Sequence, residues 1–528
     1  MQKLQVIFLI FYVVSSHAVP LSTSSRWIVD DSTGERVKLA CANWPGHLEP
    51  MLPEGLHKRS LSEIALHISL LGFNCIRLTW ATYMYTRYSN LTVTQSLQNW
   101  NLTKAIDGIM QNNPNLLNIT LVDAQKAVIE ELASNNVMVL LDNQVSKPMW
   151  CCGDTDGNGF FGDKYFDPIE WLQGLSIVSN KYKDTPMVMA MSLRNELRGP
   201  LVNESIWYQY IEKGAQTIHK GNPNVLVVIS GLYYDLDFRM LKNRSLNLNI
   251  RNKIVYETHR YSFSDGQEQR WLNQPINNVC ANITSELEDK VGFLIKGKNP
   301  APLFVTEFGN DQLGGNPSGD FFLPCFMSYL ADKDLDWALW ALQGSYYLRD
   351  GQQDPEETYG LFNSSWRPLR NPNYHSKLQF IQRKIQDPYS NQNYLILYHS
   401  LSGRCARATN NELYVSECWG MSKWTHQGEG SPIRLQGTEL CLKAIGDGLS
   451  VTLTNDCNSN QTMWKFALNS QYQLATEDES GTSLCLDWDP YYSRKVLTNK
   501  CIISGDDFVN LQNPQSQWFK LITSNVSQ

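Results

Sequence analysis

The sequence predicts two folded parts: an α/β domain built as a (β/α)8 barrel, followed by a smaller all-β domain. Three observations support this prediction. Eight short apolar runs recur between residues 39 and 344, segments with helical spacing lie between several of them, and a cysteine repeat replaces this pattern after residue 393. Buried parallel strands alternate with helices in α/β barrels, and eight such units close into a ring.

The eight runs are almost continuously apolar, as expected of strands buried on both faces. They are Leu39–Trp44, Phe73–Trp80, Val137–Gln144, Met187–Glu196, Asn224–Gly231, Ile254–Tyr261, Pro302–Gly309 and Asp336–Gly344. Helical spacing is clearest in Ser62–Leu71, Leu121–Ala133 and Trp207–His219. Before the first run, Arg26–Leu39 predicts a hairpin around Ser32–Gly34.

Composition and the N-terminus indicate a globular, secreted protein. The 528 residues are 42% hydrophobic and 18% charged, and the net charge of −7 argues against nucleic-acid or anionic-membrane partners. Residues 1–18 read as a signal peptide, with Lys3, an apolar segment Leu4–Val14 and a cleavage site at Ser16–Ala18. This apolar segment is too short to span a bilayer. The mature protein is therefore expected to be extracellular, at the cell wall, and monomeric.

Sequons and cysteines agree with secretion. Nine Asn-x-Ser/Thr sequons begin at Asn90, Asn101, Asn118, Asn203, Asn243, Asn282, Asn363, Asn460 and Asn525. The chain has 12 cysteines, which in an oxidising compartment predict disulfides.

The polar stretch Gln386–Asn393 breaks the helical pattern and is interpreted as a linker between domains at 19–385 and 394–528. An internal repeat follows it. The cysteines pair in sequence as Cys405/Cys418, Cys441/Cys457 and Cys485/Cys501, and the units are followed by Trp424, Trp464 and Trp518. This triple repeat resembles the ricin-type β-trefoil lectins over about Tyr394–Leu521. The resemblance implies a carbohydrate-binding-like domain in which these cysteines and tryptophans are scaffold.

The resemblance also gives one candidate lectin site. Ricin-type sugar sites use an aspartate soon after the first cysteine of a unit. The third unit has Asp487 there, with Tyr491 and Tyr492 as candidate stacking groups, whereas the other units have Arg407 and Lys443. Either the third unit keeps a sugar site, or the three repeats are a structural appendage.

Two of the predicted barrel strands end in a carboxylate, Glu196 and Glu307. Catalytic groups of such barrels lie at the carboxyl ends of the strands, and cleavage of a glycosidic bond needs a pair of carboxyl groups. The barrel resembles glycoside hydrolase family 5, the cellulase-type retaining enzymes, over about Trp27–Lys384. The residues that carry the resemblance are Arg77, Asn195, Glu196, His259, Tyr261, Glu307 and Trp340.

The resemblance implies a role for each residue. Glu196 is expected to be the general acid/base and Glu307 the nucleophile, with carboxyl groups about 5–5.5 Å apart. Arg77 would favour the charged form of Glu307, while burial and a like charge would raise the pKa of Glu196. Asn195 would hold the sugar 2-hydroxyl, and His259 would bond Glu196 or the sugar. Tyr261 would position Glu307, and Trp340 would stack on a sugar face.

Two features depart from the family pattern or add to it. The third strand ends in Asp142-Asn143-Gln144, without the histidine that usually lines the cleft, which leaves the substrate class open. After it, Asp154–Asp163 begins like an EF-hand loop but has Tyr165 where the last ligand should be, so we interpret it as a polar turn-rich loop. Cys151 and Cys152 are expected to be disulfide partners. No metal and no cofactor are predicted.

The leading hypothesis is a secreted retaining endo-β-glycosidase that acts on a glucan- or mannan-type polysaccharide and carries a separable lectin-like domain. Transglycosylation is a close variant, because a sugar can replace water in the second step. The alternative from another class is a lectin-like carbohydrate-binding protein on a catalytically retired barrel.

Overall fold

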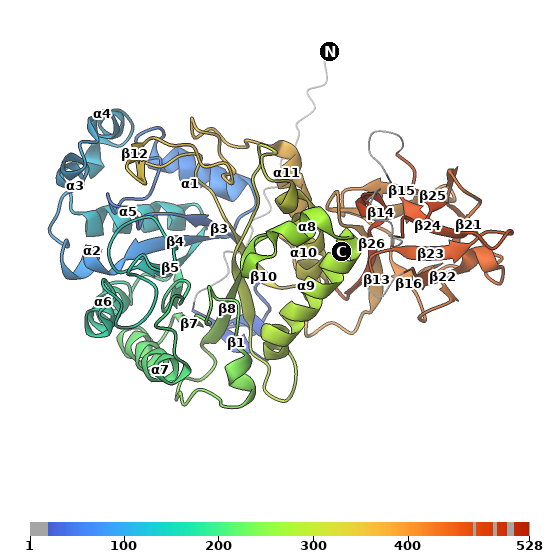
Figure 1. Ribbon diagram of the computed structural model, residues 1–528, viewed down its shortest axis with the longest axis horizontal. Helices are drawn as coiled ribbons and strands as arrows, with labels where there is room; N and C mark the ends of the chain where they lie inside the picture. The colour runs from blue at the N-terminus through green and yellow to red at the C-terminus, as the bar shows by residue number, and fades with distance from the viewer. Residues whose placement is uncertain (1–19, 468–470, 489–493, 504–511, 527–528) are drawn as a thin grey trace, which may run out of the picture.

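The computed structural model describes residues 20–467, 471–488, 494–503 and 512–526. The predicted signal peptide, together with Tyr491 and Tyr492, lies outside these described residues. Across the described residues, no helix combines the length and the apolar character needed to cross a membrane. Figure 1 shows a barrel with its surrounding helices and, beside it, a region of short strands.

The predicted barrel is confirmed: eight parallel strands close in the order β10-β3-β4-β5-β6-β7-β8-β9. The strands are β3 (Ala40–Trp44), β4 (Cys75–Ala81), β5 (Met138–Val145), β6 (Val188–Ser192), β7 (Leu226–Ile229), β8 (Ile254–Arg260), β9 (Leu303–Phe308) and β10 (Asp336–Leu339). Each lies within one of the eight apolar runs or differs from it by one residue at an end. Their continuous burial explains why the runs lack polar alternation.

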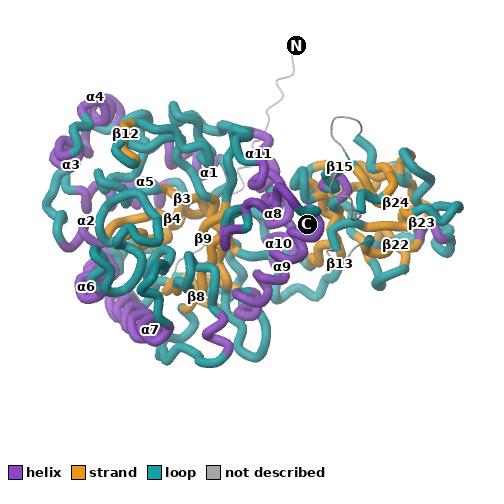
Figure 2. Tube along the Cα trace, in the orientation of Figure 1, coloured by secondary structure: helices purple, strands orange, loops and turns teal. Residues whose placement is uncertain are grey.

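Helices cover the outside of this ring (Figure 2). They are α1 (Leu61–Leu70), α2 (Thr82–Thr86), α3 (Val93–Asn99), α4 (Thr103–Asn112), α5 (Leu121–Ser134), α6 (Pro168–Lys181), α7 (Glu204–Gly221), α8 (Glu268–Asn273), α9 (Ile276–Lys290), α10 (Pro317–Lys333) and α11 (Pro372–Leu378). The three helices expected from periodicity are α1, α5 and α7. The side chains of Ser60, Thr120 and Asn203 cap their first turns by accepting backbone N–H bonds.

The N-terminal hairpin differs from its prediction. A turn does occur at Ser32–Gly34, because the Asp30 carboxylate accepts the N–H groups of Ser32 and Thr33, and Val29 then pairs with Arg36. The main partner of β2 (Trp27–Asp30), however, is β1 (Leu21–Ser24), which precedes it. Apolar side chains of this segment form one cluster with lumen residues of the strands and close one end of the barrel.

A buried ion cluster ties this segment to the rest of the barrel. The carboxylate of Asp334 contacts the guanidinium of Arg36 and lies 3.0 Å from the Lys38 ammonium. It also accepts the backbone N–H groups of Ile385 and Gln386, at 2.8 and 2.7 Å. Asp334, which follows α10, therefore connects the segment between β2 and β3 to the start of the predicted linker.

The described residues between 394 and 526 form the all-β region that the repeat predicts, with strands in an eight-stranded and a six-stranded sheet. The strands are β13 (Tyr394–His399), β14 (Arg404–Thr409), β15 (Glu412–Ser416), β16 (Trp424–Thr425), β17 (Ser431–Pro432), β18 (Arg434–Leu435), β19 (Cys441–Lys443), β20 (Leu449–Ser450), β21 (Thr452–Thr454), β22 (Met463–Phe466), β23 (Leu474–Glu477), β24 (Ser483–Asp487), β25 (Leu497–Lys500) and β26 (Phe519–Ser524). All three local cysteine pairs form disulfides. Trp424 and Trp464 fill the core of this region.

The barrel and the all-β region share a buried junction. Trp518 packs in the same apolar cluster as the barrel helices, and its indole donates to the side chain of Asn277 in α9 at 2.7 Å. Asn277 in turn donates to Gln473 at 2.8 Å. Phe380 stacks on Tyr398 with ring centroids 4.9 Å apart. The two parts therefore meet through a continuous apolar and hydrogen-bonded contact.

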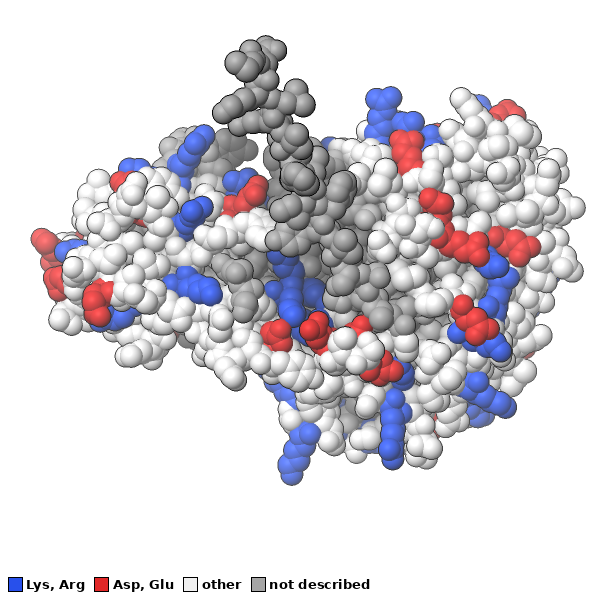
Figure 3. All heavy atoms as spheres, turned by 180° about the vertical axis from the view of Figure 1, so that it is seen from behind, with Lys and Arg blue, Asp and Glu red and all other residues white. Residues whose placement is uncertain are grey.

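Charged side chains of both signs are interspersed on the face opposite to that of Figure 1 (Figure 3). This mixture agrees with the modest net charge of −7. Described residues on this face form no continuous basic surface of the kind that binds nucleic acid.

Candidate active site

A cavity of about 920 Å³ opens at the carboxyl ends of the barrel strands. Among the sequence-predicted site residues, five line it: Glu196, His259, Tyr261, Glu307 and Trp340. Arg77 and Asn195 lie beneath them, fully buried. The barrel thus brings all seven predicted residues together from five different strands or strand ends.

Both carboxylate oxygens of Glu307 accept hydrogen bonds. The Arg77 guanidinium donates to Oε1 at 2.6 Å, and the Tyr261 hydroxyl donates to Oε2 at 3.0 Å. Charge-assisted donors of this kind stabilise an ionised carboxylate and fix its orientation. The pairings of Glu307 with Arg77 and Tyr261 match those expected from the sequence.

Arg77 is held by a buried set of acceptors. Burial opposes its charge, but the carboxylates of Asp142, Glu307 and Glu257 outweigh that effect and raise the pKa of Arg77 above its ordinary value. Its guanidinium lies 3.0 Å from Asp142 and donates to Asn195 at 2.8 Å. Burial raises the pKa of Asp142 to about 7. Arg77 is therefore a fixed positive charge beneath Glu307.

Glu196 differs sharply from Glu307 in its surroundings. Its side chain is 12% exposed, and burial raises the pKa of Glu196 to about 7. The like charge of Asp156 adds to this effect, so burial and a like charge act in the direction expected from the sequence. The Glu196 backbone has φ of +47°, a left-handed conformation that non-glycine residues rarely adopt. Its N–H donates to the buried Asp235 at 2.8 Å, which holds this conformation.

His259 connects Glu196 to the barrel interior. Its Nδ1 lies 2.8 Å from the Glu196 carboxyl, and its Nε2 lies 3.0 Å from the Thr306 hydroxyl. Thr306 donates its proton to Glu257, so its oxygen is free to accept from Nε2–H. Burial lowers the pKa of His259 to about 4, so the ring is neutral near pH 7. Neutral His259 with a proton on Nε2 has an acceptor at Nδ1, which suits a protonated Glu196.

The two carboxyl groups lie close together. One atom each from Glu196, His259 and Glu307, a carboxylate oxygen or a ring nitrogen, lie within 4.8 Å of one another. Inverting glycosidases need a gap of about 6.5–9.5 Å to hold a water, whereas retaining enzymes need only about 5–5.5 Å. This geometry suits direct attack by one carboxylate while the other transfers a proton.

Aromatic side chains line the cavity around these groups. Trp340 is 8% exposed, and Trp150 lies near it with ring centroids 6.4 Å apart. Phe263 stacks on Tyr261 at 4.9 Å, and Tyr233 is exposed at the edge. Trp150, Phe263 and Tyr233 were not identified from the sequence, since an isolated aromatic residue in a loop carries no local signal of its position.

Two buried polar groups also face the cavity. His47 follows the first barrel strand, binds Thr79 through Nδ1 at 2.7 Å, and has no protein partner for Nε2. Gln144 at the end of β5 has no protein partner for its amide oxygen. Gln144 was noted from the sequence, at the strand end that lacks the usual histidine. His47 was not identified from the sequence, although its place just after a strand end was an available signal.

The insert after β5 forms hydrogen-bonded turns. Asp154 accepts from the Tyr234 hydroxyl, Asp156 from Arg198, and Asp163 from backbone N–H groups, so these three carboxylates bind different protein donors. They are not among the described acidic groups that converge closely enough to share an ion. Cys151 and Cys152 form a disulfide with each other, as expected of disulfide partners.

The candidate lectin residue Asp487 lies in the all-β region and is 8% exposed. Its carboxylate accepts from Asn499 at 3.0 Å and from Gln517 at 3.1 Å. These bonds orient the carboxylate.

Comparisons with known proteins identify the family of this chain. Residues 33–345 match the family model for cellulase (glycosyl hydrolase family 5). A "Glycosyl hydrolase 5 family protein" from Chamaecyparis obtusa is 44% identical over 99% of this chain and 97% of its own length. An endoglucanase from Paenibacillus polymyxa is 22% identical over 66% of this chain and 84% of its own.

A solved structure shares the fold. The catalytic domain of the major endoglucanase from Xanthomonas campestris pv. campestris is 21% identical, covers 69% of this chain and 99% of its own, and has a TM-score of 0.56. The family model and the relative from Chamaecyparis obtusa, which is similar over nearly the whole chain, together place the sequence: this chain belongs to glycosyl hydrolase family 5 and is a glycosyl hydrolase.

Proposed function

We propose that this protein is a secreted retaining endo-β-glycosidase acting on a β-linked glucan or mannan, with Glu196 as general acid/base and Glu307 as nucleophile. The observation that carries the proposal is the placement of the two carboxyl groups within 4.8 Å, each in a different electrostatic setting. Arg77 and Tyr261 donate hydrogen bonds that orient the Glu307 carboxylate, while burial raises the pKa of Glu196 and favours its protonated form.

In the first step, ionised Glu307 attacks the anomeric carbon of the substrate. Protonated Glu196 transfers its proton to the glycosidic oxygen as the bond to the leaving sugar breaks. A covalent glycosyl ester of Glu307 results, and Glu196 is left ionised.

In the second step, ionised Glu196 takes a proton from an incoming hydroxyl, which attacks the anomeric carbon and releases Glu307. Water as the incoming group gives hydrolysis, and a sugar hydroxyl gives transglycosylation. The two outcomes use the same residues. In this proposal Asn195 binds the sugar 2-hydroxyl and Trp340 packs on a sugar face; the hydrogen bond from Arg77 to Asn195 and the position of Trp340 in the cavity wall support these roles.

The names of the relatives favour a glucan as substrate, because two of them are endoglucanases. Gln144 stands where the family usually has a histidine, which keeps mannan as the second candidate. His47 Nε2 and the Gln144 amide oxygen are both buried in the cavity wall without a protein partner, so sugar hydroxyls would satisfy them.

For the all-β region we propose a ricin-type β-trefoil that binds the polymer through Asp487. The threefold disulfide repeat and the oriented Asp487 carboxylate support this assignment. Binding of the polymer there would raise the concentration of substrate near the cavity.

The test is a substrate panel of soluble β-glucans, β-mannans and aryl β-glycosides, with the wild type compared to Glu307→Gln. We expect cleavage of at least one β-linked polymer with retention of anomeric configuration, and loss of activity by a factor of about 10³ or more in the variant. The anomer formed first is read by NMR. A wild type that binds these polymers without cleaving any of them would favour the lectin-like protein on a retired barrel.

A further inference from the structure

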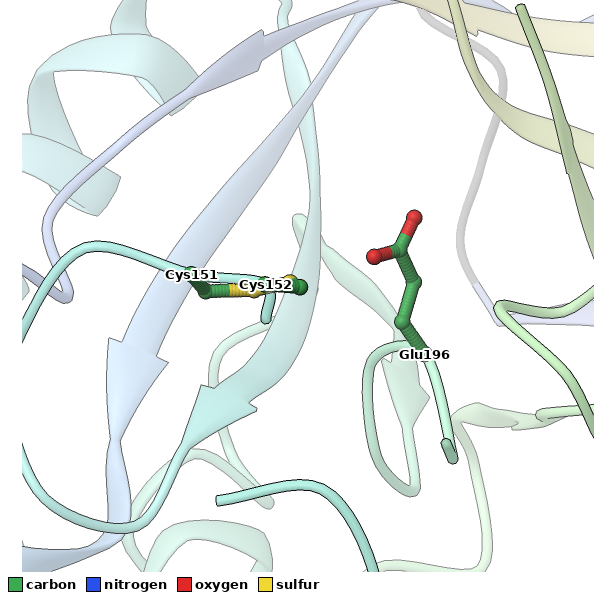
Figure 4. Close-up of side chains that lie close together, drawn as sticks. All are labelled: Cys151, Cys152 and Glu196. Carbon is green, nitrogen blue, oxygen red and sulfur yellow. A yellow bond between two sulfur atoms is a disulfide. The ribbon is translucent and has the colours of Figure 1, made fainter. Parts of the chain in front are cut away.

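The disulfide between the adjacent residues Cys151 and Cys152 lies in the wall of the catalytic cavity and has no role in the mechanism above. Both cysteines line the cavity, and Cys152 is half-buried. Figure 4 shows the disulfide facing the Glu196 side chain. The two sulfur atoms and a carboxylate oxygen of Glu196 lie within 4.8 Å of one another.

The position of the disulfide relative to the two carboxyl groups is specific. Among the described residues, Glu196 belongs to two close groups of side chains, one with the two cysteines and one with His259 and Glu307. Glu196 is the one member that the groups share. In the proposed mechanism Glu307 bonds to the retained sugar, whereas Glu196 protonates the oxygen of the departing sugar. The disulfide is therefore next to the leaving-group side of the scissile bond.

The surroundings fix the disulfide in place. Ala81 and Val145 pack behind Cys151 in a small apolar cluster. From below, the amide nitrogen of Asn195 donates to both sulfur atoms, at 3.6 Å for Cys151 and 3.4 Å for Cys152. Because protein groups hold it from behind and below, its remaining face is directed to the cavity.

The chemistry of that face suits a sugar ring. A disulfide has no charge and no proton to donate, and its sulfur atoms are polarizable and pack well against apolar surfaces. Trp150, which precedes it in the chain, also lines the cavity and adds an aromatic ring on which sugars can pack. A pyranose has an apolar face of ring C–H groups, which gains contacts there without having to give up hydrogen bonds of its hydroxyls.

We propose that the Cys151–Cys152 disulfide, extended by Trp150, is the binding surface for the apolar face of the leaving-group sugar. The inference rests on the proposed function, since it uses the assignment of Glu196 as the acid. The ligand class is a β-linked pyranose unit on the reducing side of the bond that breaks.

The test compares two substrates that differ in the leaving group alone. One is the soluble oligosaccharide that the wild type cleaves, and the other is the β-glycosyl fluoride of the same retained sugars, whose leaving group has no ring to bind. The variant is Cys151→Ala/Cys152→Ala. The matched control is Cys280→Ala/Cys325→Ala, which removes the disulfide between α9 and α10, where neither cysteine lines the cavity.

We expect kcat/KM for the oligosaccharide to fall about tenfold or more in the Cys151/Cys152 variant, while turnover of the fluoride stays unchanged. In the control variant, kcat/KM should change by the same factor for the oligosaccharide and for the fluoride. An equal loss of kcat/KM on both substrates would mean that the disulfide acts on the retained sugar through Asn195. No loss on either substrate would mean that the disulfide contacts no sugar. Each of these results overturns the proposal.

Trp150→Ala provides a second test if the double variant fails to fold. This variant should lose kcat/KM on the oligosaccharide and keep its turnover of the fluoride. An equal loss on both substrates, or no loss on either, would again overturn the proposal. A wild type that cleaves neither the oligosaccharide nor the fluoride would instead contradict the proposed function itself, so the two failures are distinguishable.

Discussion

The backbone N–H of Glu196 donates to the buried carboxylate of Asp235 at 2.8 Å, and this bond holds Glu196 in a left-handed conformation, with φ of +47°. Such a conformation costs roughly 1–3 kcal/mol and persists where neighbouring groups enforce it. It directs the carboxyl of Glu196 toward His259 and Glu307. Asp235 is therefore a positioning residue for the proposed acid.

Asp235→Ala should remove the acceptor of the Glu196 N–H and allow the carboxyl group to move. We expect kcat to fall about tenfold or more with KM little changed, because misplacement of a catalytic group by about 1 Å can cost up to 10²-fold. Asp235→Asn keeps a side-chain oxygen at the same place and should restore most of the activity. A fall of equal size in both variants would argue against positioning through this hydrogen bond.

The plot of kcat/KM against pH should have a falling limb that is set by loss of the proton from Glu196. Burial raises the pKa of this group to about 7, and the first step needs it protonated. Activity on substrates with sugar leaving groups is therefore expected to be highest below pH 7 and to fall as the pH rises through that value. The check is kcat/KM against pH for wild type, and for Glu196→Gln acting on the β-glycosyl fluoride. The variant should lose the limb; a profile that rises between about pH 7 and 8 would contradict the assignment.

Tyr261→Phe should lower the rate of the first step. The hydroxyl of Tyr261 donates to Glu307 at 3.0 Å, and burial raises the pKa of Tyr261 well above its ordinary value, so it remains a donor at neutral pH. We expect a fall of about tenfold or more in kcat, because Glu307 loses one of its orienting bonds. The ring stacks on Phe263, so the melting temperature should change little. Unchanged kinetics would show that Arg77 alone orients Glu307.

Asp334→Asn should destabilise the barrel without altering the active site. Arg36 and Lys38 would keep their buried charges while losing a carboxylate, a change that typically costs about 3–5 kcal/mol. The pKa of Asp334 lies below its ordinary value because Arg36 and Lys38 outweigh burial, so its stabilisation is present above about pH 4 and is lost as the pH falls below that value. Urea unfolding measures the difference.

Glu477→Gln is the matched control for this measurement. Its partner Lys465 lies at 2.7 Å, but both side chains are about half exposed, so the loss should stay within about 1 kcal/mol. A similar loss in both variants would show that burial of the Asp334 cluster does not decide its contribution.

The sequence predicts a separable C-terminal domain, and cutting near Asp387 tests this expectation. The buried contacts of Trp518, Asn277 and Gln473 lead us to expect that the truncated barrel melts at a lower temperature, since it exposes an apolar face. Activity on a small soluble glycoside should survive while the barrel stays folded, because the site residues all come from the barrel. Lost turnover in a barrel shown to be folded would contradict the two-part interpretation.

Asp487→Ala tests the lectin site with the junction intact. We expect weaker retention on insoluble polymer and unchanged turnover of small substrates, because Asp487 is not among the residues that line the cavity. Binding to polymer columns and initial rates on both substrates are the measurements. Unchanged retention would assign the all-β region a structural role.

The sequence by itself determined the barrel and the two proposed catalytic residues. Strands buried on both faces leave continuous apolar runs, and two of these runs finish near a carboxylate, so Glu196 and Glu307 could be identified from local pattern. Arg77 and His259 followed from the resemblance. The C-terminal repeat is equally local, because each disulfide closes a short loop.

Tertiary structure alone decided the contacts between segments that lie far apart in sequence. The junction through Asn277 and Trp518 depends on how strands and loops close around the barrel, and so does the meeting of His47 with Trp150 and the Cys151–Cys152 disulfide in one cavity. The physical reason is that a loop residue carries no periodic signal, so its neighbours are set by the fold and not by the residues beside it in the chain. The resemblance predicted a raised pKa for Glu196, and burial inside the folded barrel sets its value of about 7.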